Sequence, residues 1–209
     1  LGVWRPFERS SLAEDVLGPL VLGAPFAIAW WWHWRQGTRE ALAWGGRKRH
    51  TAVRRSGLYV LAFVGLGGLA IGAAWGLGSL LSLIDASDAA ARETVLWEDT
   101  TPALAAIIFG LALWAPVWRT VRRDFASAPV TVAASLPRRA YLLLVSGLAV
   151  VALMLSLALF VYRLMQTLLD TGESSSETWP VAAAVVAAIV LAAHLWRLRL
   201  DALLLAEQP

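Results

Sequence analysis

Residues 114–119 read WAPVWR and residues 138–141 read RRAY, and related signals stand earlier in the chain as WWWHWR at 30–35 and RRSGLY at 54–59. Seven positions recur at a fixed offset of 84, namely Trp30/Trp114, Trp34/Trp118, Arg35/Arg119, Arg39/Arg123, Glu40/Asp124, Arg54/Arg138 and Arg55/Arg139. Each copy has a hydrophobic run that ends in Trp-Arg, a basic loop, and a second hydrophobic run that opens with Arg-Arg and a tyrosine. This pattern predicts a duplicated membrane hairpin.

The composition indicates that a bilayer is the main solvent of the chain. Apolar residues make up 58% of its 209 residues and the mean hydropathy is +0.62, which leaves too little polar surface to cover a soluble globule. Five runs are long enough to cross about 30 Å of hydrocarbon, which takes roughly 20 helical residues. They are residues 16–34, 57–84, 102–118, 141–165 and 179–196. The chain has no cysteine, which excludes disulfides, thiolate catalysis and cysteine-ligated metals.

The predicted fold is therefore all-α, a polytopic membrane bundle of five transmembrane helices in a single domain over residues 1–209. A third, partial copy is indicated because Pro180 to Trp196 covers the same interval as Pro102 to Trp118, and both end in Trp-Arg. The predicted repeats, about two and a half copies of a two-helix unit, are residues 16–84, residues 102–169 and the half repeat 179–200.

The charges of the connecting segments predict the orientation. Segments 35–56 and 119–140, together with the C-terminal end, hold 14 of the 18 Lys and Arg but only 4 of the 15 Asp and Glu. Because basic loops stay on the cytoplasmic side, we expect the N-terminus outside and the C-terminus in the cytoplasm, in the inner (plasma) membrane. The run at 16–34 is expected to be retained, because Glu14 and Asp15 precede it where a signal peptide is basic.

The paired motifs also carry a resemblance to a known family. Its residues here are Trp34-Arg35 with Arg54, Arg55 and Tyr59, then Trp118-Arg119 with Arg138, Arg139 and Tyr141, and finally Trp196-Arg197. The chain resembles bacterial integral membrane proteins catalogued as a domain of unknown function, in which helices ending Trp-Arg alternate with helices opening Arg-Arg-x-Tyr. The resemblance implies a membrane location and a bundle of helix pairs, and it supplies no catalytic residue.

Tryptophan and histidine gather at the predicted inner ends of the helices. An aromatic belt at headgroup depth is the favoured interpretation of these tryptophans. In the alternative, Trp30, Trp31 and Trp34 line a pocket for a flat apolar ligand such as a quinone, a carotenoid or a lipid. His33 and His194 each lie beside a Trp-Arg pair, so two helices could present imidazoles to haem b from both sides. The favoured expectation is that no cofactor is bound.

Small residues predict where helices approach closely. Gly68, Gly72 and Gly76 form a stripe of four-residue spacing on the second helix, as in small-xxx-small contacts. We expect this stripe to be a packing seam. The fifth helix offers a matching stripe, and a helix from another chain is equally allowed as a partner. The matching stripe consists of Ala184, Ala188 and Ala192.

A basic cluster precedes the second predicted span. It consists of Arg47, Lys48, Arg49, Arg54 and Arg55. The favoured interpretation is that these side chains act only as a topology signal. In the alternative they contact headgroups of the anionic inner leaflet, where each cation contributes on the order of 1 kcal/mol. Nucleic acid is not an expected partner, because no folded basic domain surrounds the cluster.

The middle of every predicted span lacks ionisable side chains, which disfavours a pump or an ion-coupled carrier. Ser146 and Ser156 have no recognisable base partner, so an enzyme is not expected. The favoured function is a non-catalytic integral membrane protein, an accessory or scaffold subunit that packs with other membrane subunits in a larger energy-transducing or transport complex. The alternative is a membrane module that binds a flat apolar ligand at its cytoplasmic-side Trp/His face.

Overall fold

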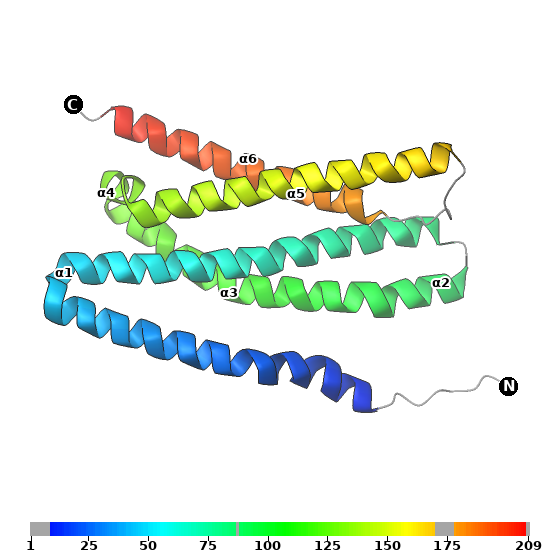
Figure 1. Ribbon diagram of the computed structural model, residues 1–209, viewed down its shortest axis with the longest axis horizontal. Helices are drawn as coiled ribbons and strands as arrows, with labels where there is room; N and C mark the ends of the chain where they lie inside the picture. Colours follow the sequence, from blue (N-terminus) through cyan, green and yellow to red (C-terminus); the bar gives the residue numbers. More distant parts are fainter. Residues whose placement is uncertain (1–8, 87, 170–177, 208–209) are drawn as a thin grey trace. The chain divides into compact units, whose positions relative to one another are not determined.

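The computed structural model describes residues 9–86, 88–169 and 178–207, with the backbone alone for several of them, including 9–24 and 44–49. The elements, drawn in Figure 1, are α1 (Arg9–Asp85), α2 (Ala89–Thr94), the π-helix η1 (Val95–Thr100), α3 (Thr101–Ser127), α4 (Pro129–Ala133), α5 (Leu136–Leu168) and α6 (Trp179–Ala206). The described residues contain no strand, which confirms the all-α prediction for them. The chain divides into two compact units, Leu1–Gly57 and Leu58–Pro209, and the single domain stays a prediction.

Four stretches of the described chain are long and apolar enough to cross a membrane. They are His50–Ile84, Ala91–Ser127, Leu136–Leu168 and Trp179–Ala206, and they contain the last four predicted spans. The protein is therefore a membrane protein. The first predicted span, 16–34, falls partly on residues whose side chains lie outside those described, so it stays a prediction.

The basic segment 35–56, predicted as a loop, is helical and belongs to α1. The loop prediction is wrong because Arg, Glu, Ala and Leu, which favour helix, dominate much of this segment. A straight helix would separate residues 34 and 57 by about 35 Å. Yet a Cβ built on Gly57 would lie 3.0 Å from the Trp34 ring, and one on Gly37 would lie 4.0 Å from Val53. The chain of the first unit therefore reverses direction between these residues.

Proline marks the beginning of α3, α4, α5 and α6. Pro102, Pro129, Pro137 and Pro180 occupy the first turns of α3, α4, α5 and α6. Proline is tolerated there because the first N–H groups of a helix have no partner within the helix. Segment 119–140 was also predicted as a basic connection. It is mostly helical and is divided between the end of α3, all of α4 and the beginning of α5.

The core of the second unit joins α1, α3 and α5. Its buried residues are Tyr59, Ala62, Trp118, Val121, Tyr141, Leu142 and Val145. The large apolar side chains that point outward include Ile108, Met154 and Ile189, each more than 60% exposed. A lipid environment accounts for this distribution, because hydrocarbon solvates such side chains without cost. The 33 residues of α5 extend about 50 Å, so its ends reach beyond the hydrocarbon.

Candidate functional site

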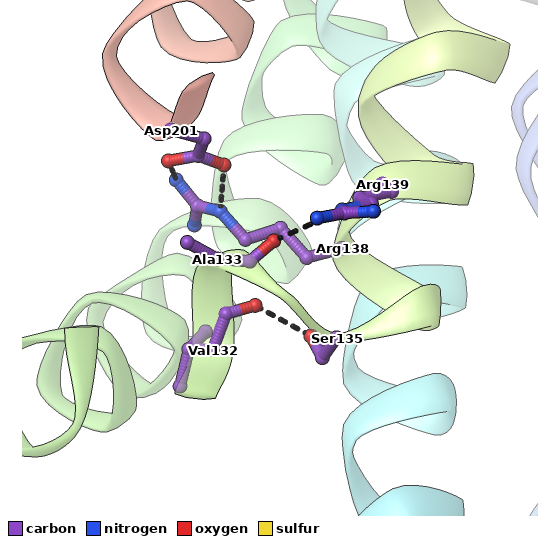
Figure 2. A network of polar contacts seen from close by, with 6 residues as sticks. All are labelled: Val132, Ala133, Ser135, Arg138, Arg139 and Asp201. Atoms are coloured by element: carbon purple, nitrogen blue, oxygen red, sulfur yellow. Dashed lines mark hydrogen bonds and ion pairs between the residues drawn. The ribbon is translucent and has the colours of Figure 1, made fainter. Parts of the chain in front are cut away.

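A buried ion pair joins α5 to α6. Arg138 Nε donates to Asp201 Oδ2 at 2.5 Å, and Arg138 Nη2 donates to Asp201 Oδ1 at 2.9 Å (Figure 2). Each of the two residues is only 5% exposed. The Phe125 ring centroid lies 4.3 Å from the guanidinium carbon, and Tyr59 also interacts with Arg138. Because a planar guanidinium fits a carboxylate at both oxygens, this pair fixes the relative orientation of α5 and α6.

The short helix α4 and the turn that follows it direct Arg138 towards α6. Val132 and Ala133 of α4 are almost fully buried and anchor the connection. Ser135 Oγ donates to the Val132 carbonyl at 2.6 Å, and Arg139 Nε donates to the Ala133 carbonyl at 3.4 Å (Figure 2). These bonds supply partners for carbonyl groups at the end of α4. Arg139 thus stabilises the turn, while its neighbour Arg138 reaches the carboxylate.

Aromatic rings connect α1, α3 and α5 next to this pair. Trp114 and Trp118 are stacked with centroids 5.5 Å apart, and Trp118 lies 6.3 Å from Tyr141. Tyr141 in turn lies 5.3 Å from Tyr59. The Arg197 guanidinium carbon sits 4.5 Å from the Trp118 ring centroid, a cation–π contact from α6. We call these rings, the ion pair, Arg197 and His194 the polar-aromatic cluster.

His194, one of the predicted haem ligands, is buried in this cluster. Its Nδ1 lies 2.8 Å from the Val190 carbonyl, and its Nε2 lies 3.4 Å from the Tyr141 hydroxyl. A carbonyl only accepts, so Nδ1 donates, and in the neutral ring Nε2 accepts from the hydroxyl. His33 belongs to the first unit and makes an edge contact with Trp32, with centroids 5.0 Å apart. Paired ligation of haem by the two histidines stays a prediction.

The predicted glycine stripe lies against α3. A Cβ built on Gly72 would lie 2.7 Å from a backbone nitrogen of α3. Cβ atoms built on Gly68 and Gly76 would lie 3.5 and 3.7 Å from the nearest atoms of α3. Gly110 of α3 faces the same seam, and a Cβ there would fall against the backbone nitrogen of Leu69. The contact is thus with α3, and the alanine stripe suggested as a match lies elsewhere, on α6.

The first unit holds the remaining predicted site residues. Trp30 is 39% exposed, while Trp34 is half-buried and packs against Gly57. Residues 34 and 57 correspond, at the offset of 84, to Trp118 and Tyr141, which are in contact in the second unit. Among the predicted headgroup contacts, Arg54 is exposed and Arg55 is half-buried. The side chains of Arg47, Lys48 and Arg49 lie outside the described residues, so their headgroup contact stays a prediction.

An apolar cavity of about 440 Å³ lies between α1, α5 and α6 of the second unit. Small residues create it, chiefly Gly67, Ala70, Ala74, Ala149, Ala183 and Ala187. Ser156 is the single hydroxyl among the lining residues. Left empty, this volume would deprive the surrounding side chains of van der Waals contacts on one side. Water is a poor occupant as well, because a buried water needs two to four polar partners.

Sequence reasoning missed three of these features. It treated Arg138 as a topology signal and did not pair it with Asp201. The signal available was a lone acid beside Arg197 and Arg199 in an otherwise apolar helix. It also missed Gly110 and the cavity, which depend on how neighbouring helices are rotated. Among the described residues, no group of three or more His, Asp or Glu side chains is placed to hold a metal ion.

These features define a polytopic α-helical membrane protein with a polar-aromatic cluster at one end of its second unit and an apolar cavity next to that cluster. The chain belongs to the family described as a domain of unknown function, DUF5671, which matches residues 55–193. The match includes the cavity and most of the polar-aromatic cluster, and it ends just before His194, Arg197 and Asp201. Comparisons with curated proteins and with solved structures found no match.

Proposed function

We propose that this protein is a non-catalytic integral membrane protein, an accessory or scaffold subunit that packs with other subunits in a larger energy-transducing or transport complex. The observation that carries the proposal is a small-residue face of α6 that the described helices leave open. Ala188 and Ala192 are exposed, and Ala184 is half-buried one turn away. The glycine stripe of α1 is already occupied by α3. In a bilayer such a face allows another helix backbone to approach closely.

The polar chemistry of the second unit supports a structural rather than a catalytic role. Arg138 is engaged by Asp201, and His194 has a contact at each ring nitrogen. Catalytic groups, in contrast, face a site where a substrate atom can sit about 3 Å away. The buried charges therefore serve to hold α5, α6 and the aromatic rings together.

The proposal extends to orientation, repeat and location. Five spans, arranged as two and a half helix pairs, place the N-terminus outside and the C-terminus in the cytoplasm of a bacterial inner membrane. The excess of basic residues at one end of α3, α5 and α6 supports this orientation. The contacts Trp34–Gly57 and Trp118–Tyr141, 84 positions apart, support the duplication.

The subunit proposal is tested by gentle detergent extraction from native membranes, followed by native gel electrophoresis and mass spectrometry of the band. The wild-type chain should migrate with defined partners in fixed stoichiometry. Ala188→Leu with Ala192→Leu should release it from them, because the branched side chains keep the partner helix away. Ala158→Leu, on an exposed position of α5, is the matched control and should leave the complex intact.

Two results contradict the subunit proposal. One is migration of the wild-type chain alone, and the other is a complex equally intact in the α6 double variant and the Ala158→Leu control. An absorption spectrum of the same band addresses the alternative ligand face. A Soret or carotenoid band that disappears in Trp34→Ala or His33→Ala would favour that face instead.

Orientation can be measured with single cysteines, because the natural chain contains none. Thr94→Cys and Ser127→Cys are near-isosteric changes at exposed positions on either side of the predicted span 102–118. In intact cells a membrane-impermeant maleimide should label residue 94, whereas residue 127 should react only after the inner membrane is opened. The reverse pattern would overturn the proposed orientation, and labelling of both in intact cells would contradict a span between them.

A further inference from the structure

We propose that the cavity between α1, α5 and α6 binds one acyl chain of a membrane phospholipid, inserted from the end of the bundle that carries Trp75 and Trp179. This inference goes beyond the subunit proposal, because it concerns a different face of the molecule and needs no protein partner. The lining is almost entirely apolar, so hydrocarbon fits it and water does not. An empty cavity of about 440 Å³ would also lose the contacts that its lining atoms need.

The length of the cavity matches that of one acyl chain from a single leaflet. Its lining extends on α5 from Val145 to Leu159, about 21 Å at 1.5 Å per residue, and on α6 from Trp179 to Val190, about 16 Å. One leaflet contributes half of a hydrocarbon core about 30 Å thick, hence about 15 Å. A planar macrocycle does not fit this description, because its dimensions are similar in two directions rather than long in one.

The two ends of the cavity differ in a way that orients the acyl chain. At one end Val145 and Val190 belong to or pack against the buried core, so this end is closed. At the other end Trp75 is 38% exposed and Trp179 is 49% exposed, as expected for indoles at headgroup depth. Hydroxyl groups lie next to Trp179, since Thr178 Oγ1 donates to the Gly78 carbonyl at 2.8 Å and lies 3.1 Å from Ser82 Oγ. A polar headgroup is therefore accommodated at the open end and a methyl terminus at the closed end.

Gly67 supplies a sharp test, because a Cβ built on it meets nothing within 4 Å although the residue lines the cavity. Gly67→Phe would direct a ring into the cavity without a backbone clash. Gly147 of α5 also meets nothing within 4 Å, but it is exposed and does not line the cavity. Gly147→Phe is therefore a matched control that adds the same ring to an outward face.

The purified protein is reconstituted in phosphatidylethanolamine and phosphatidylglycerol vesicles that contain phosphatidylethanolamine with a diazirine in the middle of one acyl chain. After photolysis, labelled residues are mapped by mass spectrometry. The wild-type protein should carry more label at Ala149 and Ala152 than at the outward Met154. Gly67→Phe should lose that excess, and Gly147→Phe should keep it. Ala152→Phe, on the opposite wall, should act like Gly67→Phe and covers the case in which Gly67→Phe does not fold.

Three outcomes would overturn the proposal. The first is labelling of the lining equal to that of Met154 in the wild-type protein. The second is an excess of label that survives both cavity-filling variants while circular dichroism shows them folded. The third is a different occupant: an isoprenoid lipid that copurifies and displaces the acyl probe, or a protein helix captured by a photo-crosslinker at residue 152 in native membranes. Failure of the subunit proposal would leave the labelling result unchanged, so the two tests are separable.

Discussion

Asp201→Ala is expected to destabilise the second unit by about 3–5 kcal/mol, the usual cost of removing one partner of a buried ion pair. A guanidinium stays protonated in proteins, so Arg138 would lose both carboxylate contacts while its charge remains, and at 5% exposure water cannot replace them. The loss should appear as a lower midpoint of unfolding in a detergent titration, followed by circular dichroism. It should also loosen α6, because the ion pair orients that helix against α5.

Two further variants serve as controls for that result. Glu207→Ala removes an exposed acid a little further along the chain and should change the midpoint little. Arg138→Met combined with Asp201→Leu should recover most of the stability, because apolar side chains of similar volume can replace a buried pair. If the Asp201→Ala and Glu207→Ala variants have the same midpoint of unfolding, the ion pair contributes little to stability and the role assigned to it is wrong.

The second large effect is expected at Gly110. Gly110→Ala adds a single methyl group, yet that carbon would fall against the backbone nitrogen of Leu69 and 2.8 Å from the Gly65 carbonyl oxygen. Backbone atoms cannot rotate away as a flexible side chain can, so the α1–α3 seam must widen. Overpacking of this kind costs about 1–3 kcal/mol and occasionally more. Thermal unfolding in detergent should therefore show a clear fall in the midpoint.

Gly147→Ala is the control for that prediction. The same methyl group meets open space there, and replacing glycine in a helix interior should stabilise α5 by up to about 1 kcal/mol. The two variants thus have the same chemistry and opposite expected signs. A Gly110→Ala protein as stable as the Gly147→Ala protein would show that the seam is looser than described.

Several features were within reach of the sequence because they depend on residues close together in the chain. Hydropathy located the four stretches that are long and apolar enough to cross a membrane, and Pro102, Pro137 and Pro180 stand in the first turns of α3, α5 and α6. Membership of a family of unknown function was expected and is confirmed, whereas the tandem Trp-Arg and Arg-Arg motifs as features of that family stay a prediction. The segment 35–56 was predicted as a loop because it connects two hydrophobic runs, but its backbone belongs to α1, and arginine and glutamate favour helix.

The candidate site was less accessible to such reasoning. Gly68, Gly72 and Gly76 were recognised as a stripe, but a stripe does not name its partner, which proved to be α3 rather than a helix with matching alanines. Arg138 was read as a loop cation because its partner, Asp201, is 63 positions away. His194 was recognised as unusual, yet its hydrogen bonds with Val190 and Tyr141 required the positions of two helices.

The sequence by itself thus determined that this chain is a helical membrane protein, which four of its stretches are long and apolar enough to cross a bilayer, and where its basic residues gather. Those properties follow from transfer of side chains between water and hydrocarbon, which is nearly additive along the chain. Only the tertiary structure decided that Arg138 meets Asp201, that Gly110 closes against α1, and that small residues of three helices surround a cavity. These depend on the rotation and neighbours of each helix, which are set by packing between residues far apart in the chain.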